Sequence, residues 1–117
     1  MTDYIVVLVT CSSTREGHRI AQAVVKRRLA ACVNVLAAPV VSVFRWKGKV
    51  GRAKETLLLI KSSKKRLAAL RAAILQIHSY DVPEFIALPV AAGSPAYLRW
   101  LSDCLRDPGR ARQRKRK

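Results

Sequence analysis

The segment HSYDVPE, residues 78–84, carries an imidazole, a hydroxyl, a phenol and two carboxylates within seven consecutive positions. The neutral imidazole of a residue such as His78 is a borderline-soft donor that suits Cu(II), Ni(II) and Zn(II). Copper stands at the top of the affinity order for divalent ions, so His78 is the first candidate metal ligand. A histidine that follows a helix can instead serve only to contact the free carbonyls and the dipole at the helix end.

Part of the same segment is explained by a turn. Pro83 forces Val82 into an extended conformation, which ends the turn and starts the following strand. His78, Tyr80 and Glu84 are not needed for that turn, and they remain candidates for a site.

Apolar periodicity predicts the elements that must position these residues. β-Branched and aliphatic runs predict strands at 4–10, 32–46, 55–61 and 84–90, with Pro39 at an edge or bulge of the second. Helical spacing predicts a helix after a capping box of Ser13 and Glu16, one that Ser62 or Ser63 caps and whose buried stripe spans 67–77, and one that begins at Pro95. This β-α-β-β-α-β order with a terminal helix is the ferredoxin-like arrangement, an α+β fold with an antiparallel sheet.

The predicted strands are apolar without alternation. An antiparallel sheet with helices on one face and water on the other has strands that alternate apolar and polar residues. Residues 5–9, 57–60 and 85–88 are instead continuously apolar. Both faces must therefore be buried, and a second copy of the chain is the expected cover, which predicts a homo-oligomer.

Composition predicts one domain, residues 1–107, followed by a basic tail, residues 108–117. The net charge is +16, and it falls to +10 when the six cations of the final RARQRKRK are left out. Such a tail is expected to be disordered. It is either a contact for nucleic acid or another acidic surface, or a solvated appendage. The candidate contacts are Arg110, Arg112, Arg114, Lys115, Arg116 and Lys117.

The three cysteines match no zinc-ribbon or CxxC pattern. No apolar run is long enough to span a bilayer, and the N-terminus does not have the pattern of a signal peptide. We therefore expect reduced thiols in a cytoplasmic protein without a membrane contact. No nucleophile–base signature, phosphate-binding loop or zincin motif is present, so the sequence indicates a protein that is not an enzyme.

Six fragments in the same order resemble the CutA divalent-cation tolerance family, and together they cover roughly residues 4–106. They are VVLVTC (6–11), RLAACVNV (28–35), FRWKGK (44–49), LLLIKS (57–62), YDVPEFIALPV (80–90) and GSPAYLRWL (93–101). The resemblance implies a ferredoxin-like homotrimer related in architecture to the PII-type signal proteins. It also implies a role in the tolerance of, or response to, divalent metal ions, copper above all, with copper(II) as the expected ion and no organic cofactor. Where relatives often have an acid-rich loop after the W-x-G-K turn, this chain has the basic segment 49–54.

The resemblance also implies site residues. In some relatives the histidine that matches His78 is implicated in copper binding, sometimes with a cysteine of the first strand. That cysteine matches Val9 here, and Cys11 lies two residues further along, on the same face but about 7 Å away. A cleft between subunits is expected to gather Cys32, Trp46, Lys61, Tyr80 and Glu84.

Two interpretations of that cleft stay open. A cleft with a lysine, a glutamate, a tyrosine and a tryptophan can bind a small anion or zwitterion, as a PII-like signalling or scaffolding trimer would, or a partner protein. Alternatively Lys61 and Glu84 form an ion pair within the interface, because Lys61 at the end of an apolar strand needs a carboxylate or an exit to water. Cys32 in its apolar surroundings can also be a small buried hydrophobic residue.

Overall fold

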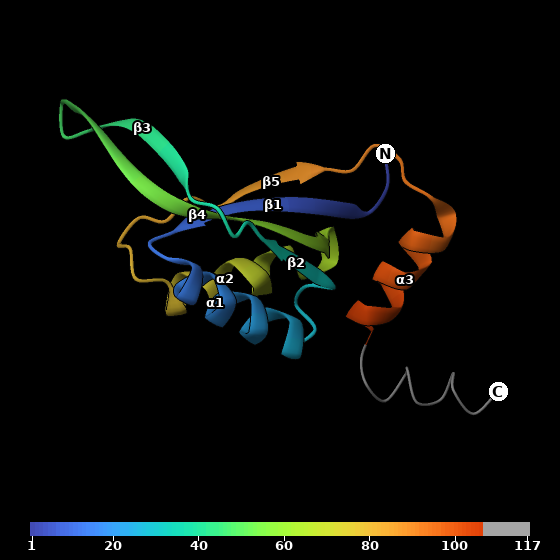
Figure 1. The fold of residues 1–117 in the computed structure, drawn as a ribbon. Helices are drawn as coiled ribbons and strands as arrows, with labels where there is room; N and C mark the ends of the chain where they lie inside the picture. The colour runs from blue at the N-terminus through green and yellow to red at the C-terminus, as the bar shows by residue number, and fades with distance from the viewer. Residues whose placement is uncertain (107–117) are drawn as a thin grey trace.

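The computed structural model describes residues 1–106, and the strands and helices of this part follow the predicted order (Figure 1). They are β1 (Tyr4–Cys11), α1 (Thr14–Lys26), β2 (Cys32–Val35), β3 (Val40–Trp46), β4 (Lys49–Ser63), the 3₁₀ turn η1 (Lys64–Arg66), α2 (Leu67–Ile77), β5 (Ile86–Pro89) and α3 (Pro95–Leu105). The predicted tail, with its six candidate nucleic-acid contacts, lies outside the described residues.

The main sheet has the strand order β2-β4-β1-β5 with antiparallel pairing throughout. Helices α1 and α2 both lie on one face of it, and α3 lies at the end near the N-terminus (Figure 1). The predicted ferredoxin-like α+β fold is therefore confirmed.

The prediction of one strand over residues 32–46 was wrong in detail. Val35 pairs with Leu58 and Val40 pairs with Glu55. The chain therefore advances five residues from Val35 to Val40, opposite an advance of only three residues on β4. The extra residues, with Pro39 among them, interrupt the pairing, because proline has no N–H to donate to the ladder. β2 and β3 are thus separate strands that both pair with β4.

β3 and the first half of β4 form a hairpin, residues 40–55, that we call the ribbon. It projects beyond the helices (Figure 1). Its turn is Lys47 and Gly48, with φ of 50° and 79°. Positive φ at both central residues is the conformation of a type I′ turn, whose twist matches that of paired strands. β4 is longer than the predicted 55–61 because it supplies half of this ribbon.

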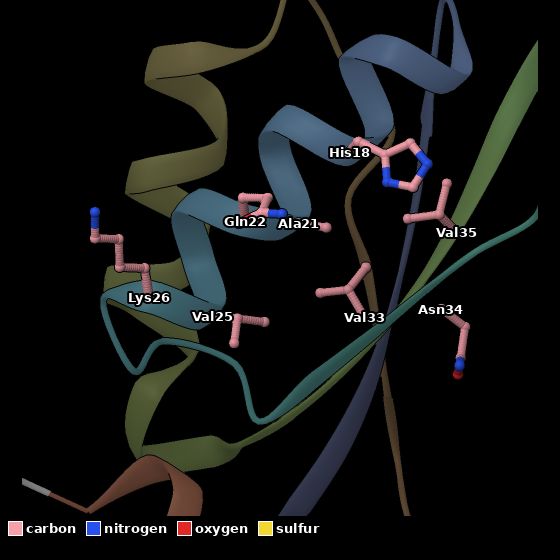
Figure 2. Close-up of a pocket in the computed structure, with 8 residues that line it drawn as sticks. All are labelled: His18, Ala21, Gln22, Val25, Lys26, Val33, Asn34 and Val35. Carbon is pink, nitrogen blue, oxygen red and sulfur yellow. The ribbon is translucent and has the colours of Figure 1, made fainter.

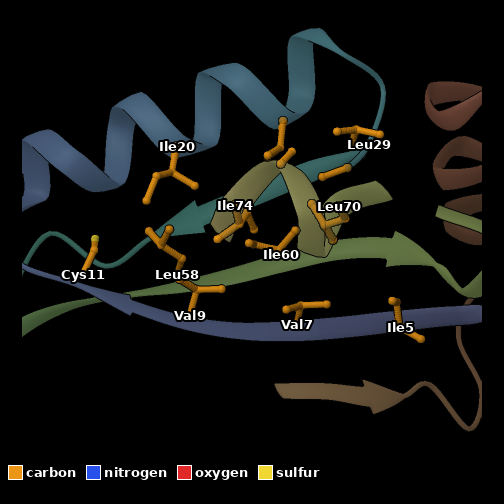
Figure 3. Close-up of a cluster of buried hydrophobic side chains, with 13 residues drawn as sticks. Ile5, Val7, Val9, Cys11, Ile20, Leu29, Leu58, Ile60, Leu70 and Ile74 are labelled. Carbon is orange, nitrogen blue, oxygen red and sulfur yellow. The ribbon is translucent and has the colours of Figure 1, made fainter. Parts of the chain in front are cut away.

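The core lies between the helices and the sheet (Figure 3). Alternate residues of β1 and β4 point into it, as their period of two requires, and they meet apolar residues of α1 and α2. Each such side chain that is fully buried contributes about 1.5–3 kcal/mol. Gly17 lets α1 approach closely, because a Cβ there would meet Leu58 Cδ2 at 3.1 Å. The completely buried aliphatic side chains are Val7, Val9, Ile20, Val24, Leu58, Ile60, Leu70 and Ile74.

The other face of the sheet is also apolar, as predicted, and α1 and α2 leave it uncovered (Figure 1). Its residues are the strand positions between those of the core, and they are half-buried or exposed. Ile86 and Leu88 of β5 are 49% and 45% exposed. We call this set the open face; it consists of Val6, Leu8, Leu57, Leu59, Ile86 and Leu88.

Two arginines fix the end of α3. Arg28 Nη1 donates to the carbonyl of Cys104 at 3.1 Å, and Arg66 Nη2 donates to that of Leu105. These carbonyls have no partner within the helix, and cations stabilise the negative end of the helix dipole. α3 is thereby held to the segments that follow α1 and β4.

Candidate functional site

His78 caps the C-terminal end of α2, but its ring reaches β1 rather than the carbonyls of its own helix. The ring is buried, and its Nε2 lies 2.8 Å from the carbonyl oxygen of Thr10. Its Nδ1 accepts the backbone N–H of Tyr80 at 3.0 Å. A nitrogen that accepts cannot carry a proton, so this network assigns the neutral tautomer, in which Nε2–H donates to Thr10.

Glu16 lies beside this imidazole, with Oε2 at 3.8 Å from His78 Nδ1. As the capping box predicted, Ser13 Oγ accepts the N–H of Glu16 at 3.1 Å. The carboxylate does not bind the N–H of Ser13, however. It accepts the N–H and hydroxyl of Ser12 at 3.0 and 2.7 Å, and those of Ser79 at 2.8 and 3.0 Å.

These contacts set the charge of Glu16. Burial alone would raise the pKa of its carboxyl group. The hydrogen bonds from Ser12 and Ser79 outweigh burial and lower the pKa to about 2. Glu16 is therefore ionised at neutral pH, at the start of α1, where the helix dipole also favours negative charge.

Tyr80, in the turn that follows α2, connects this network to Glu55 of β4. Its ring packs 4.7 Å from that of His78, centroid to centroid, and its hydroxyl donates to Glu55 Oε2 at 2.8 Å. Burial, and then the bond to the Glu55 carboxylate, raise the pKa of Tyr80 far above its ordinary value, so the phenol stays protonated.

Cys11 is completely buried at the end of β1. Its thiol lies 3.5 Å from the carbonyl oxygen of Ser13 and 3.7 Å from that of Thr56. Burial, and then the negative charge of Glu16, raise the pKa of this thiol above its ordinary value. Cys11 is therefore a thiol and not the thiolate that binds metals or attacks substrates.

We call the six residues of this network the junction: Cys11, Glu16, Glu55, His78, Ser79 and Tyr80. Of these, Glu16, Glu55 and Ser79 were not predicted as site residues. Both ring nitrogens of His78 are occupied by hydrogen bonds, and no group of three or more His, Cys, Asp and Glu side chains among the described residues is placed to hold a metal ion. In this arrangement the junction does not fit copper(II); it joins β1, α1, β4 and α2.

The residues expected at the cleft do not meet within one chain. Cys32 and Lys61 are neighbours in the register of β2 and β4. Trp46 lies at the tip of the ribbon, opposite Lys49. Lys61 lies twelve positions after Lys49 along β4, which is about 40 Å of strand. These residues can therefore share a cleft only if another subunit contributes.

Within one chain Lys61 does not pair with Glu84, and the ion pair expected within the interface stays a prediction. Lys61 Nζ donates to the side-chain oxygen of Asn34, its neighbour on β2. Glu84 is exposed in the segment before β5. The amide of Asn34 is closer because β2 borders β4 on the side away from β1 and β5.

Two grooves lie away from the junction. One, of about 460 Å³, runs between α1 and the edge strand β2 (Figure 2) and is lined by His18, Gln22, Lys26, Asn34 and neighbouring apolar residues. The other, of about 580 Å³, follows α3 and is lined by residues that include Tyr4, Arg99, Trp100 and Arg106. In the part of the chain that the structure describes, no helix has both the length and the apolarity needed to cross a membrane.

Comparisons with known proteins agree with this architecture. A family model described as CutA1 divalent ion tolerance protein matches residues 5–104. The chain is 43% identical over 93 residues to Protein CutA of Mus musculus, an alignment that covers 80% of this chain and 52% of the mouse protein. It is 42% identical over 98 residues to the divalent-cation tolerance protein CutA of Thermus thermophilus, covering 84% of this chain and 94% of that protein.

Solved structures show the same likeness. The T. thermophilus structure matches with a TM-score of 0.81 at 42% identity, over 84% of this chain and 94% of that one. CutA1 from Oryza sativa matches with a TM-score of 0.85 at 42% identity, over 89% and 94% of the two chains. The chain spans only about half to three fifths of the mouse, Xenopus laevis and Arabidopsis thaliana relatives.

Proposed function

The chain belongs to the CutA1 divalent ion tolerance family, and from this premise we propose that it acts in the response to divalent cations as a homotrimer that binds its ligand and does not transform it. The observation that carries the proposal is the open face. Three strands contribute six apolar side chains to one surface, and α1 and α2 both lie on the other side.

The open face favours a partner with the same surface. Each leucine or isoleucine that moves from water into an interface contributes about 1.5–3 kcal/mol, so leaving this face in water would cost much of the stability of a small domain. Its edge carries the polar pair Lys61 and Asn34 beside Cys32. A closed symmetric assembly buries the apolar centre and leaves such groups at the rim. Three copies are the number that the family resemblance implies.

Binding without catalysis is supported by the state of the junction. His78 has no free nitrogen, Cys11 is a protonated thiol and Glu16 has the pKa of a very weak base. A general base needs a free lone pair and a pKa near the operating pH. A nucleophile needs a free lone pair that no proton occupies. We also propose a reducing compartment such as the cytoplasm, because the three cysteines are unpaired.

Copper(II) is the cation we propose, because the family resemblance implies copper above the other divalent ions and copper stands at the top of their affinity order. The junction as it stands does not fit that ion, so the proposal assigns no ligand set within one chain. His78 and Cys11 are the first residues to test for a part in it.

The test combines the mass of the purified oligomer with a Cu(II) titration by calorimetry, with Zn(II) in parallel and a reductant that does not bind metal. We expect three chains per particle and saturable copper binding at a fixed ratio of ions to chains. A monomer that stays folded on dilution, or copper binding without a fixed ratio, would overturn the proposal.

The chain contains only two histidines, which provides a matched control. His18 is exposed on α1, beside the groove of Figure 2, and His78 is buried in the junction. Loss of copper binding in His78→Gln but not in His18→Gln would assign the ion to the junction. The opposite result would assign it to the groove between α1 and β2.

A further inference from the structure

The ribbon carries a concentration of positive charge that the proposed function does not use. Residues 45–54 contain five cations and no acid, and all five are exposed. Neither of the two salt bridges among the described residues involves them. The ribbon extends away from the helices, so these charges project from the body of the chain (Figure 1). The five residues are Arg45, Lys47, Lys49, Arg52 and Lys54.

Three of these cations share one face of the ribbon. Successive cross-strand pairs join Val41 with Lys54, Val43 with Arg52 and Arg45 with Val50. Residues that face each other across two strands, and every second residue along each strand, lie on the same side. Each pair thus presents one valine and one cation, and the three valines are 60–68% exposed. We call these six residues the basic face.

The opposite face of the ribbon has a different character. The ring of Phe44 packs over Gly51, where an added Cβ would lie 3.4 Å from the ring. Lys49 and Glu55 lie on that same side, opposite Trp46 and Val40. Neither face is wholly apolar, whereas an element that lies in a membrane interface needs one face that is.

We propose that the basic face of the ribbon binds nucleic acid along the phosphate backbone. Its cations are spread along the ribbon and do not converge in a pocket, which suits an extended polyanion better than a small anion. Arg52 and Lys54 are two residues apart, so they project about 7 Å from each other along β4. A two-stranded antiparallel ribbon is also one of the elements that the major groove of DNA admits.

The inference does not depend on the proposed cation response, because it uses no residue of the junction or of the open face. The ribbon is also distinct from the basic tail, which lies outside the described residues, so the test must separate these two sources of charge. The charge variants therefore keep the tail in the full chain, and a separate deletion of residues 110–117 tests the tail.

The experiment measures binding of a short labelled DNA duplex by fluorescence anisotropy over a series of salt concentrations. The test variant is Arg45→Gln/Arg52→Gln/Lys54→Gln. The control is Lys64→Gln/Lys65→Gln/Arg71→Gln, which removes three exposed cations near the opposite end of β4. The two variants have the same net charge, so only the place of the charge differs.

We expect the wild type to bind with strong salt dependence, and the ribbon variant to bind about tenfold more weakly at low salt. Its slope of log K against log salt should be lower by about 2.7, three contacts at about 0.9 each. The control should differ little from the wild type. The charge-conserving variant Arg45→Lys/Arg52→Lys/Lys54→Arg should bind like the wild type, since phosphate contacts need charge more than shape.

Four results would overturn the proposal. The first is that the wild type does not bind the duplex, and the second is that both triple variants weaken duplex binding equally. The third is that deleting residues 110–117 abolishes duplex binding while the ribbon variant binds like the wild type. The fourth is that the wild type binds phosphatidylserine vesicles in place of DNA. The single variant Arg52→Gln repeats the measurement with the smallest change to the hairpin. Circular dichroism and oligomer mass confirm that each variant is folded.

Discussion

The hydroxyl of Tyr80 donates to a carboxylate oxygen of Glu55 at 2.8 Å, although 25 residues separate them. Glu55 pairs with Val40 and so belongs to the first rung of the ribbon, while Tyr80 lies in the turn after α2. The ring of Tyr80 also packs against that of His78, which bonds to β1. One line of contacts therefore joins β1, the turn after α2 and the base of the ribbon.

Removing the hydroxyl should weaken this connection. In Tyr80→Phe the half-buried Glu55 carboxylate loses a charge-assisted hydrogen bond, which is worth about 1.5–3 kcal/mol when fully buried and less here. We expect a loss of about 1 kcal/mol, measured as a lower urea midpoint at fixed protein concentration, because the stability of an oligomer depends on concentration.

A double-mutant cycle checks the cause. If the bond carries the effect, Glu55→Gln will lose stability too, and the double variant will lose less than the sum of the two. Additive losses would show that Tyr80 acts through its packing on His78 and not through Glu55.

Glu16 gives the fold a specific sensitivity to acid. Its pKa falls from 4.5 to about 2 in the folded chain. The folded state thus gains stability from the ionised carboxylate at any pH above about 4.5, and this gain is lost as the pH falls towards 2. The full gain is on the order of 3 kcal/mol. We expect the urea midpoint to fall steeply between pH 4.5 and 2.

The matched variants are Glu16→Gln and Asp81→Asn. Glu16→Gln should be less stable at pH 7, because the NH₂ group of its amide cannot accept a hydrogen bond from the N–H donors of Ser12 and Ser79. Its urea midpoint should also decline less steeply below pH 4.5. Asp81 is exposed, so its variant should keep the decline of the wild type. An unchanged decline in Glu16→Gln would show that another group causes the acid sensitivity.

The order of elements and the buried stripe of α2 were predictable because both follow from local periodicity. Leu70 and Ile74 are completely buried, as their helical spacing required. The first part of β4, which completes the ribbon, was not predicted, because Val50 and Gly51 flanked by cations do not show a strand pattern. Only pairing with β3 makes the segment extended, so its structure depends on tertiary context more than on propensity.

The junction was predicted only in part, for a physical reason. His78 and Tyr80 stood out by residue type, and Ser13 by its capping motif. The partners that decide their chemistry are distant in sequence: Glu16 and Ser79 are 63 residues apart, and His78 and Thr10 are 68 apart. A helix cap predicts where Glu16 lies but not that a serine from another turn completes its hydrogen bonds.

Arg28 offers a test of backbone strain in the turn after α1. The N–H of Arg28 bonds to the carbonyl of Val25 and that of Leu29 to Val24, which is a Schellman motif with arginine at the position usually held by glycine. Its φ of 58° is left-handed. Arg28→Ala and Arg28→Gly both lose the bond to Cys104, but only glycine relieves the strain. We expect the glycine variant to be more stable than the alanine variant by about 1 kcal/mol. Equal stability would show that the turn is not strained.

Two leucines of nearly equal exposure test whether the open face is an interface. Leu88 on the open face is 45% exposed within one chain, and Leu75 on the outer side of α2 is 49% exposed. In a monomer, Leu88→Asp and Leu75→Asp would therefore have similar small effects, since aspartate stays in water at either place.

In a trimer closed over the open face, the two variants must differ. Leu88→Asp would bury a charge without a partner, so it should dissociate or unfold the particle, while Leu75→Asp should keep both mass and stability. Sedimentation velocity over a dilution series measures the first effect, and thermal unfolding at the same concentrations measures the second. Similar behaviour of both variants would mean that the apolar strands are not covered by other copies of the chain, because only burial in the assembly makes these two positions unequal.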